Sequence, residues 1–345
     1  MTRISAKYFV AFLAFVFVIC ASLVIPNHPT LFEEDRVFKV LESLGSIETD
    51  KFPNTSEFGV SAKRGEALIR DGFSTKPGGG KTGQQSKHFV CTSCHNLEKE
   101  DPDLRFSDPQ ARLEYTNEKG LPFLQGTSLY GAVNRESYYN DDYYKKYGEL
   151  VVPARNDIRE AIQLCAVECA QGRKLTTWEV ESVLAYLWSI DLKLQDLELT
   201  DEEFSFIDSA IEENQKENQD SAIALIKSKF LSGSPAHFVD AQNSRDATKM
   251  LEGNTDNGKL LYENSCLPCH ENGRYSYFVL DDCDITFKHL KKKASGYSDH
   301  SIFQATRFGI YSVPGRRSYM PQYPMEKMSD QQLKDLQAYI DMRAD

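Results

Sequence analysis

The pentapeptide CTSCH occupies residues 91–95, and the pentapeptide CLPCH occupies residues 266–270. Both have the order Cys-x-x-Cys-His, in which two residues separate the thiols and a histidine follows the second thiol directly. A helical pattern precedes each pentapeptide, and another helical pattern follows it further along the chain. Because these features come twice in the same order, the sequence predicts two copies of one structural unit.

The helices expected in the two units resemble each other in detail. The four patterns are SAKRGEALIRDGF (61–73) and TTWEVESVLAYLWSI (176–190) in the first unit, and DNGKLLYENS (256–265) and SDQQLKDLQAYIDM (329–342) in the second. Each closing helix begins with a capping-box pattern, Thr176 with Glu179 and Ser329 with Gln332. No long alternation of apolar and polar residues is present, so we expect an all-α fold with little strand.

Composition limits the class of protein. The chain has 345 residues, of which 41% are hydrophobic, and a net charge of −11. This length suggests two domains, and the negative charge argues against nucleic acid as a partner. The expected organisation is an N-terminal anchor or signal (1–26), a tether (27–57), a first domain (58–195), a helical linker or insert (196–250) and a second domain (251–345).

The N-terminal segment predicts export. Arg3 and Lys7 precede an uncharged apolar run from Tyr8 to Ile25. Positive charge before such a run keeps the N-terminus in the cytoplasm and places the rest of the chain outside. The run is long enough to span a bilayer and lacks an evident cleavage site, which favours an uncleaved anchor over a removed signal peptide. We therefore expect the protein on the periplasmic side of a bacterial inner membrane, anchored or released after cleavage.

Cys-x-x-Cys-His in an exported chain indicates covalent haem. Both thiols attach to the haem, and the adjacent histidine ligates its iron. A redox-active Cys-x-x-Cys would need a strand and helix unit that the sequence lacks, and a zinc site would need four ligands. The sequence thus predicts two c-type haems, held by Cys91, Cys94 and His95 and by Cys266, Cys269 and His270.

Both units resemble class I cytochrome c domains, over about residues 58–192 and 253–343. The resemblance is strongest at the two Cys-x-x-Cys-His boxes. It implies a second axial ligand for each iron, and Met320, directly before Pro321, is similar to the Met-Pro axial loop of cytochrome c. Met325 and Met328 lie nearby and compete, although packing at the start of the last helix would also explain them. Thioether ligation raises the haem potential and suits an electron exit.

The first unit needs a different ligand, because no methionine lies between Thr2 and Lys249. No histidine lies between the first box and its closing helix. That interval contains IQLCAVECAQGRKL (162–175), in which Cys165 and Cys169 share one apolar helix face. Two core thiols would also explain this pattern, and a disulfide between helix neighbours at this spacing is not expected. The candidate distal ligand of the first haem is Cys165.

The same stretch resembles a narrower family, the dihaem thiosulfate dehydrogenases and the A-type cytochrome subunit of the sulfur-oxidising complex. The similarity lies in Ile162, Cys165, Gly172, Arg173 and Leu175. It implies a first haem with histidine and cysteine ligands, whose cysteine binds the sulfane sulfur of thiosulfate as tetrathionate forms. It also implies that electrons leave through a second haem with histidine and methionine ligands. In place of the family's usual Asn and Ser-type residues the chain has Gln163 and Cys169, which leaves the substrate open.

Three basic residues flank this cysteine. Arg155, Arg159 and Arg173 are candidates for binding an anionic substrate, although solvated helix charges would look the same. The aromatic segment 136–148 is read as a packed surface loop rather than a haem edge.

Two functions remain open from the sequence. The first is an oxidoreductase that acts on a small anionic sulfur compound and passes electrons to a partner cytochrome or oxidase. The second is a membrane-tethered dihaem electron carrier in which Cys165 only sets the haem potential. A dihaem peroxidase is less favoured, because its activatable first haem with histidine ligands is not evident.

Overall fold

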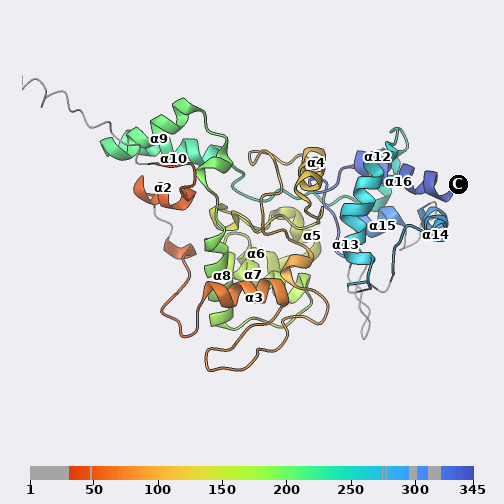
Figure 1. Cartoon of the computed structure of the whole chain (residues 1–345), viewed down its shortest axis with the longest axis horizontal. Coiled ribbons are helices and arrows are strands. Elements are labelled where there is room, and N and C mark those ends of the chain that lie inside the picture. The colour runs from red at the N-terminus through yellow and green to blue at the C-terminus, as the bar shows by residue number, and fades with distance from the viewer. Residues whose placement is uncertain (1–30, 47–48, 274, 277, 295–300, 310–319) are drawn as a thin grey trace, which may run out of the picture.

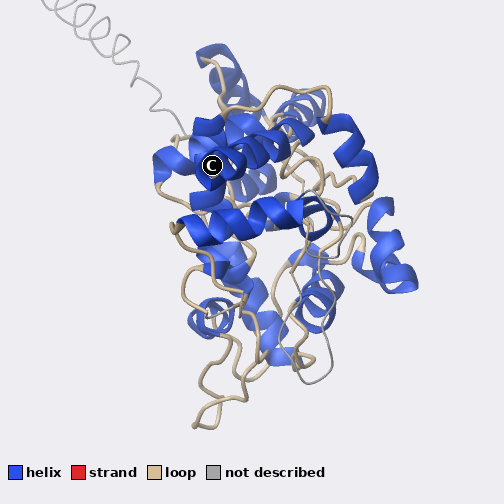
Figure 2. Ribbon diagram, turned by 90° about the vertical axis from the view of Figure 1, so that its right-hand side faces the viewer, coloured by secondary structure: helices blue, strands red, loops and turns tan. Residues whose placement is uncertain are grey.

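The computed structural model describes residues 31–345 except 47–48, 274, 277, 295–300 and 310–319. The described residues form helices and loops, and their few β-bridges are isolated, which confirms the all-α class (Figure 2). The α-helices in chain order are α2 (Val37–Ser43), α3 (Ala62–Asp71), α4 (Pro109–Lys119), α5 (Tyr144–Tyr147), α6 (Val151–Ala154), α7 (Ile158–Leu164), α8 (Thr177–Ser189), α9 (Asp201–Glu213), α10 (Lys216–Ser228), α11 (Ala241–Thr248), α12 (Thr255–Leu261), α13 (Leu267–His270), α14 (Asp284–Ala294), α15 (Ile302–Arg307) and α16 (Asp330–Ala344).

The helices gather in three groups along the long axis of the molecule (Figure 1). Helices α2, α9 and α10 lie at one end, α3, α6, α7 and α8 form the middle group, and α12 to α16 lie at the other end. The middle group contains the first Cys-x-x-Cys-His box, and the last group contains the second. Helix α4 belongs to the first unit by sequence but lies between the middle and last groups, beside α12.

Opening and closing helices cross in the same way in both units. A Cβ atom added to Gly65 of α3 would lie 1.9 Å from the carbonyl oxygen of Ser182 in α8. A Cβ atom added to Gly258 of α12 would lie 2.0 Å from the carbonyl oxygen of Asp335 in α16. Only glycine lets the two backbones approach this closely. The sequence repeat is thus matched by a repeated helix crossing.

The closing helices begin at the predicted capping boxes. Glu179 accepts a 2.8 Å hydrogen bond from the backbone N–H of Thr176. Gln332 accepts the corresponding 3.0 Å bond from the backbone N–H of Ser329. These bonds satisfy backbone donors that the first helical turn leaves without a partner, so each box fixes where its helix starts.

Part of the first unit is built into the core of the second. Leu113 of α4 and Phe123, both fully buried, share one hydrophobic cluster with Leu261, Phe287 and Tyr339 of the last group. Burial of such side chains contributes about 1.5–3 kcal/mol each. The two units therefore share packed surface instead of being joined by a linker alone.

The segments expected as tether and insert pack against each other. Val37 and Val40 of α2 are buried with Ile207 of α9 and Ile226 of α10 in one cluster. The described part of the tether thus folds back onto the insert, as Figure 1 shows for α2 beside α10. The domain boundaries themselves stay predictions.

No helix among the described residues has the length and apolar character to cross a bilayer. The apolar run from Tyr8 to Ile25, predicted to anchor the chain, lies outside the described residues.

Candidate functional site

A large cavity lies in the middle group, between the first box and the turn that contains Cys165. It encloses about 1260 Å³ of empty space, including its opening to solvent. Most of its wall is apolar, which suits a flat hydrophobic ligand. The apolar and aromatic lining residues include Leu68, Ile69, Phe89, Val90, Leu129, Ile158, Ile162, Leu175, Val183 and Leu187.

The first box forms one wall of this cavity. Cys91 and Cys94 both line the cavity as free thiols. Burial raises the pKa of Cys91 to about 11 and raises that of Cys94 further, so both sulfurs stay protonated in this apolar wall. Gly126 passes close by, because a Cβ there would lie 2.6 Å from Cε1 of His95. The backbone therefore fits tightly around the histidine ring.

The orientation of His95 suits a metal ligand. Its Nδ1 lies 2.6 Å from the carbonyl oxygen of Thr127. A carbonyl oxygen only accepts, so Nδ1 carries the proton and donates it, which leaves the Nε2 lone pair free of a proton. Burial lowers the pKa of His95, and the ring is neutral. A hydrogen bond of this kind from Nδ1 to a carbonyl oxygen fixes the tautomer of histidines that ligate metals.

Cys165 and Cys169 lie in another part of the cavity wall. Helix α7 is capped by Asp157, whose carboxylate accepts a 2.8 Å bond from the N–H of Arg159. The helix then widens into a π-helical turn over Cys165–Cys169. Such turns are rare and occur frequently at functional sites. The turn brings both sulfurs to the cavity.

Two tyrosines contact Cys169. The hydroxyl of Tyr147 lies 3.2 Å from its sulfur, and the hydroxyl of Tyr139 lies 4.0 Å from it. Tyr143 packs edge-on against Tyr139 and also lines the cavity. The aromatic segment 136–148 therefore contributes to the site, contrary to the surface-loop interpretation. No sequence signal separates these two roles, because both place tyrosines in a loop.

The pKa values of the two thiols shift in opposite directions. Hydrogen bonding to the Cys165 thiol lowers the pKa of Cys169 to about 6, against the effect of burial, and Tyr147 lowers it further. The same bond and burial raise the pKa of Cys165. The tyrosine hydroxyls contact the Cys169 sulfur, and neither forms a hydrogen bond of this kind with Cys165. Both sulfurs line the cavity, and the assignment of Cys165 as the iron ligand stays a prediction.

The three arginines predicted to bind substrate are engaged with carboxylates. Arg159 is paired with Glu181, Arg173 with Glu179, and Arg155 with Asp141. The first two are bidentate pairs, with N to O distances of 2.6 and 3.0 Å in Arg159 and of 2.7 and 2.5 Å in Arg173. None of these three side chains is part of the cavity wall as the structure describes it. Their role in substrate binding stays a prediction.

A different arginine faces the cavity. Arg135 lines it and donates a 3.0 Å hydrogen bond to the carbonyl oxygen of Ser128. Burial lowers its pKa, although the guanidinium stays charged at neutral pH. No sequence pattern singles out Arg135, because it lies far from both Cys91 and Cys165 along the chain. It is the guanidinium best placed to meet an anion in this cavity.

The second box repeats the histidine arrangement. Nδ1 of His270 lies 2.7 Å from the carbonyl oxygen of Phe278 and therefore donates to it. Burial lowers the pKa of His270. Burial also raises the pKa of Cys266 to about 12 and that of Cys269 to about 11. The thiol pair and the neutral histidine of this box fit a covalent haem as those of the first box do.

The methionines of the second unit differ in their surroundings. Met320 is half-buried, and a Cβ on Gly309 would lie 2.2 Å from its carbonyl oxygen. Met328 is 1% exposed and belongs to the core cluster, so packing accounts for it. The backbone N–H of Met325 donates 3.0 Å to the carbonyl oxygen of His237. Residues 310–319, before Met320, lie outside the described residues.

Cys283 is an exposed free thiol, outside the cavity that Cys169 lines.

Residues 253–340 match the protein family described as cytochrome C oxidase, cbb3-type, subunit III. No curated protein and no solved structure matches the chain. The matched range runs from α12 through the second box into α16. These residues form a c-type cytochrome domain, which implies a covalently bound haem and a role in electron transfer.

Proposed function

We propose that the chain is a dihaem c-type cytochrome that oxidises a small sulfur compound, of the thiosulfate-to-tetrathionate type, at the cavity of the first unit. The observation that carries this proposal is the meeting of two cysteines and the first haem box around one apolar cavity. The same cavity wall contains the buried guanidinium of Arg135, so the sulfur of Cys165 faces a space that suits a small anionic sulfur compound.

Different residues of the first unit would attach the haem, ligate its iron and bind the substrate. Cys91 and Cys94 would attach the haem, which accepts one electron at a time when bound. His95, with its proton fixed on Nδ1 by Thr127, and Cys165 would be the protein ligands of the iron. Tyr147 and Tyr139 hold Cys169 beside Cys165. Cys165 is the sulfur to which a sulfane sulfur would bind.

The reaction balances without protons. The thiolate of Cys165 and the sulfane sulfur of one thiosulfate would form a sulfur–sulfur bond with the loss of two electrons, which the haems would accept. Attack of a second thiosulfate on that sulfane sulfur would break the bond to Cys165, release tetrathionate and restore the thiolate. Arg135 in the cavity wall would attract the dianions, since a buried guanidinium pairs strongly with an anion. The roles proposed for Arg155, Arg159 and Arg173 require each of them to leave its carboxylate partner first.

The second unit would serve as the electron exit. His270 and Met320 are its proposed iron ligands, and a thioether ligand raises the potential so that electrons run towards it. A partner cytochrome or oxidase would receive them. We place the protein on the periplasmic side of a bacterial inner membrane, held by the apolar run near its N-terminus or released after cleavage.

One observation favours the alternative, a membrane-tethered carrier without its own substrate. The three arginines near Cys165 are paired with carboxylates, which leaves Arg135 as the guanidinium that faces the cavity. In the proposed enzyme the sulfur of Cys165 binds the substrate, whereas in the carrier it only sets the haem potential.

Purified protein, mixed with thiosulfate under anaerobic conditions, distinguishes them. The proposed enzyme shows thiosulfate-dependent reduction of its haems, and Cys165→Met abolishes this reduction while both haems stay bound. Cys169→Ser is the matched control for a nearby thiol, and it retains reduction. A wild-type protein that chemical reductants reduce but thiosulfate and other sulfur anions do not would be a carrier.

A further inference from the structure

A short extended segment, Pro122–Leu124, lies between the two Cys-x-x-Cys-His boxes. The side-chain amide of Asn96, the residue after His95, donates a 3.0 Å hydrogen bond to the carbonyl oxygen of Pro122. The N–H of Phe123 donates a 2.7 Å bond to the carbonyl oxygen of Asn264. This carbonyl and this N–H belong to one peptide group. A single peptide group therefore joins the residue after His95 to the residues just before Cys266.

A second connection runs beside the first. The hydroxyl of Tyr323 donates a 3.2 Å bond to the carbonyl oxygen of Phe123. The same hydroxyl lies 2.7 Å from the hydroxyl of Ser265, the residue before Cys266. Tyr323 is buried, 5% exposed. Both connections thus reach the second box through the residues next to its first cysteine.

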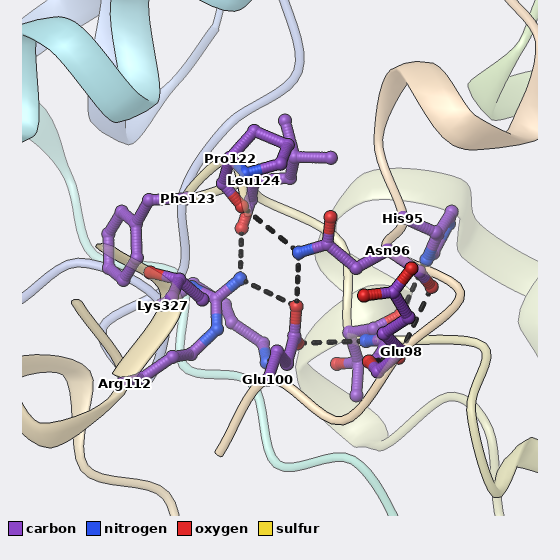
Figure 3. Close-up of polar contacts among 12 residues, drawn as sticks. His95, Asn96, Glu98, Glu100, Arg112, Pro122, Phe123, Leu124 and Lys327 are labelled. Carbon is purple, nitrogen blue, oxygen red and sulfur yellow. Dashed lines mark hydrogen bonds and ion pairs between the residues drawn. The ribbon is translucent and has the colours of Figure 1, made fainter. Parts of the chain in front are cut away.

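Charged side chains fix this segment from the other side (Figure 3). Arg112 donates a 2.6 Å bond to the carbonyl oxygen of Leu124 and a 3.0 Å bond to the carboxylate of Glu100. Glu100 also accepts from Lys327 at 3.0 Å and from the amide of Asn96 at 3.0 Å. Since one Asn96 nitrogen donates to both Glu100 and Pro122, the carboxylate orients the amide towards the peptide group.

The side chains of this network are buried. Glu100, Arg112 and Lys327 are 1%, 0% and 4% exposed, and Asn96 is 6% exposed. In a buried site of low dielectric these hydrogen bonds are stronger than they would be in water, so the contacts between the boxes are well held. An electron tunnels better through covalent and hydrogen bonds than across gaps between side chains.

We propose that the Pro122–Phe123 peptide group is the electron-transfer bridge between the two boxes, with Asn96 as the residue that connects it to the first box. The inference rests on the proposed function, because it requires a haem at both boxes. One electron leaves the first haem and one arrives at the second. No bond forms or breaks, and no proton is transferred.

The test uses the full chain with Asn96→Leu, which removes the amide but keeps a similar volume. Pulse radiolysis delivers electrons, and the approach to equilibrium between the haems is followed by their absorption bands. We expect this exchange to slow several-fold, while haem content and both reduction potentials stay near wild type. The thermal midpoint should fall, because Glu100 and the Pro122 carbonyl each lose a buried hydrogen bond. Amide exchange at Phe123 checks that its bond to Asn264 is kept. Asn134→Leu is the matched control. The side-chain amide of Asn134 accepts a hydrogen bond from the Leu192 N–H and does not belong to the proposed bridge, so this variant should leave the rate unchanged.

Asn96→Ser provides a second test if the leucine variant fails to fold, since it shortens the side chain without placing an apolar group beside Glu100. It should slow the exchange as well. An unchanged exchange rate in a folded Asn96 variant with two haems overturns the bridge. A wild-type protein with a single covalent haem overturns the proposed function instead, so the two failures are distinguishable.

Discussion

Replacing Glu100 by glutamine tests the buried charge network between the two units. The carboxylate faces Arg112 and Lys327 at 3.0 Å each, and its neutral isostere would leave two buried cations without their counter-charge. Two nitrogens of Arg112, Nε and Nη1, already have no hydrogen-bond partner, and without Glu100 the guanidinium would keep the ring of Phe123 and the carbonyl oxygen of Leu124, neither of which carries a counter-charge. Removing one partner of a buried ion pair costs about 3–5 kcal/mol. We expect Glu100→Gln to lose an amount in this range at pH 7.

Denaturant unfolding, followed separately by haem absorption and by far-UV circular dichroism, measures the loss. Glu98→Gln is the control, because Glu98 is exposed two residues earlier and an exposed change of this kind stays within about 0.5 kcal/mol. If Glu100→Gln is as stable as Glu98→Gln, the network does not hold the units together.

The same variant predicts a change in pH dependence. Burial alone would raise the pKa of Glu100, but Arg112 and Lys327 outweigh it and hold the pKa well below its ordinary value of 4.5. A carboxyl with a depressed folded pKa contributes stability that is present above the unfolded pKa and is lost as pH falls through the folded one. Wild type should therefore lose stability as pH drops below about 4.5, and the gap to Glu100→Gln should narrow. A gap that stays constant to low pH would refute this.

Three further outcomes follow from the sites and the fold. Denaturing mass spectrometry should find two covalent haems, since both boxes pair free thiols with a neutral histidine; one haem would remove the first site. Met320→Ala should abolish the far-red sulfur-to-iron band and lower the second potential, whereas an unchanged spectrum would move the assignment to Met325. Gly258→Ala should cost about 1–3 kcal/mol by overpacking against Asp335, whereas Gly78→Ala, with open space around it, should cost nothing. Equal unfolding midpoints for these two variants would contradict the close helix crossing.

Local patterns were enough to predict the opening and closing helix of each unit, but not α4, α14 or α15. The Thr176 and Ser329 capping boxes mark helix starts because their bonds lie within one turn. The placement of Cys165 at a cavity with the first box also agrees with the pattern, since a helix presents its apolar face to the core.

Contacts between segments far apart in the sequence could not be predicted from local patterns. Nothing in α4 indicates that Leu113 packs in the core of the second unit, because its apolar residue fits any partner helix. The pairing of Arg159 with Glu181 depends on how α7 meets α8, and Arg135 faces the cavity only through its loop. Charge patterns along a chain do not show which of several arginines will find a carboxylate.

The central claim is that a cysteine sulfur ligates the first haem, and electron paramagnetic resonance of the oxidised protein tests it most directly. Ligation by Cys165 predicts a low-spin thiolate-type signal that the Cys165→Met variant loses and the Cys169→Ser variant keeps. Loss of the signal in Cys169→Ser alone would assign the ligand one helical turn further along. Absence of the signal from the wild-type protein would contradict sulfur ligation and, with it, the proposed sulfur chemistry.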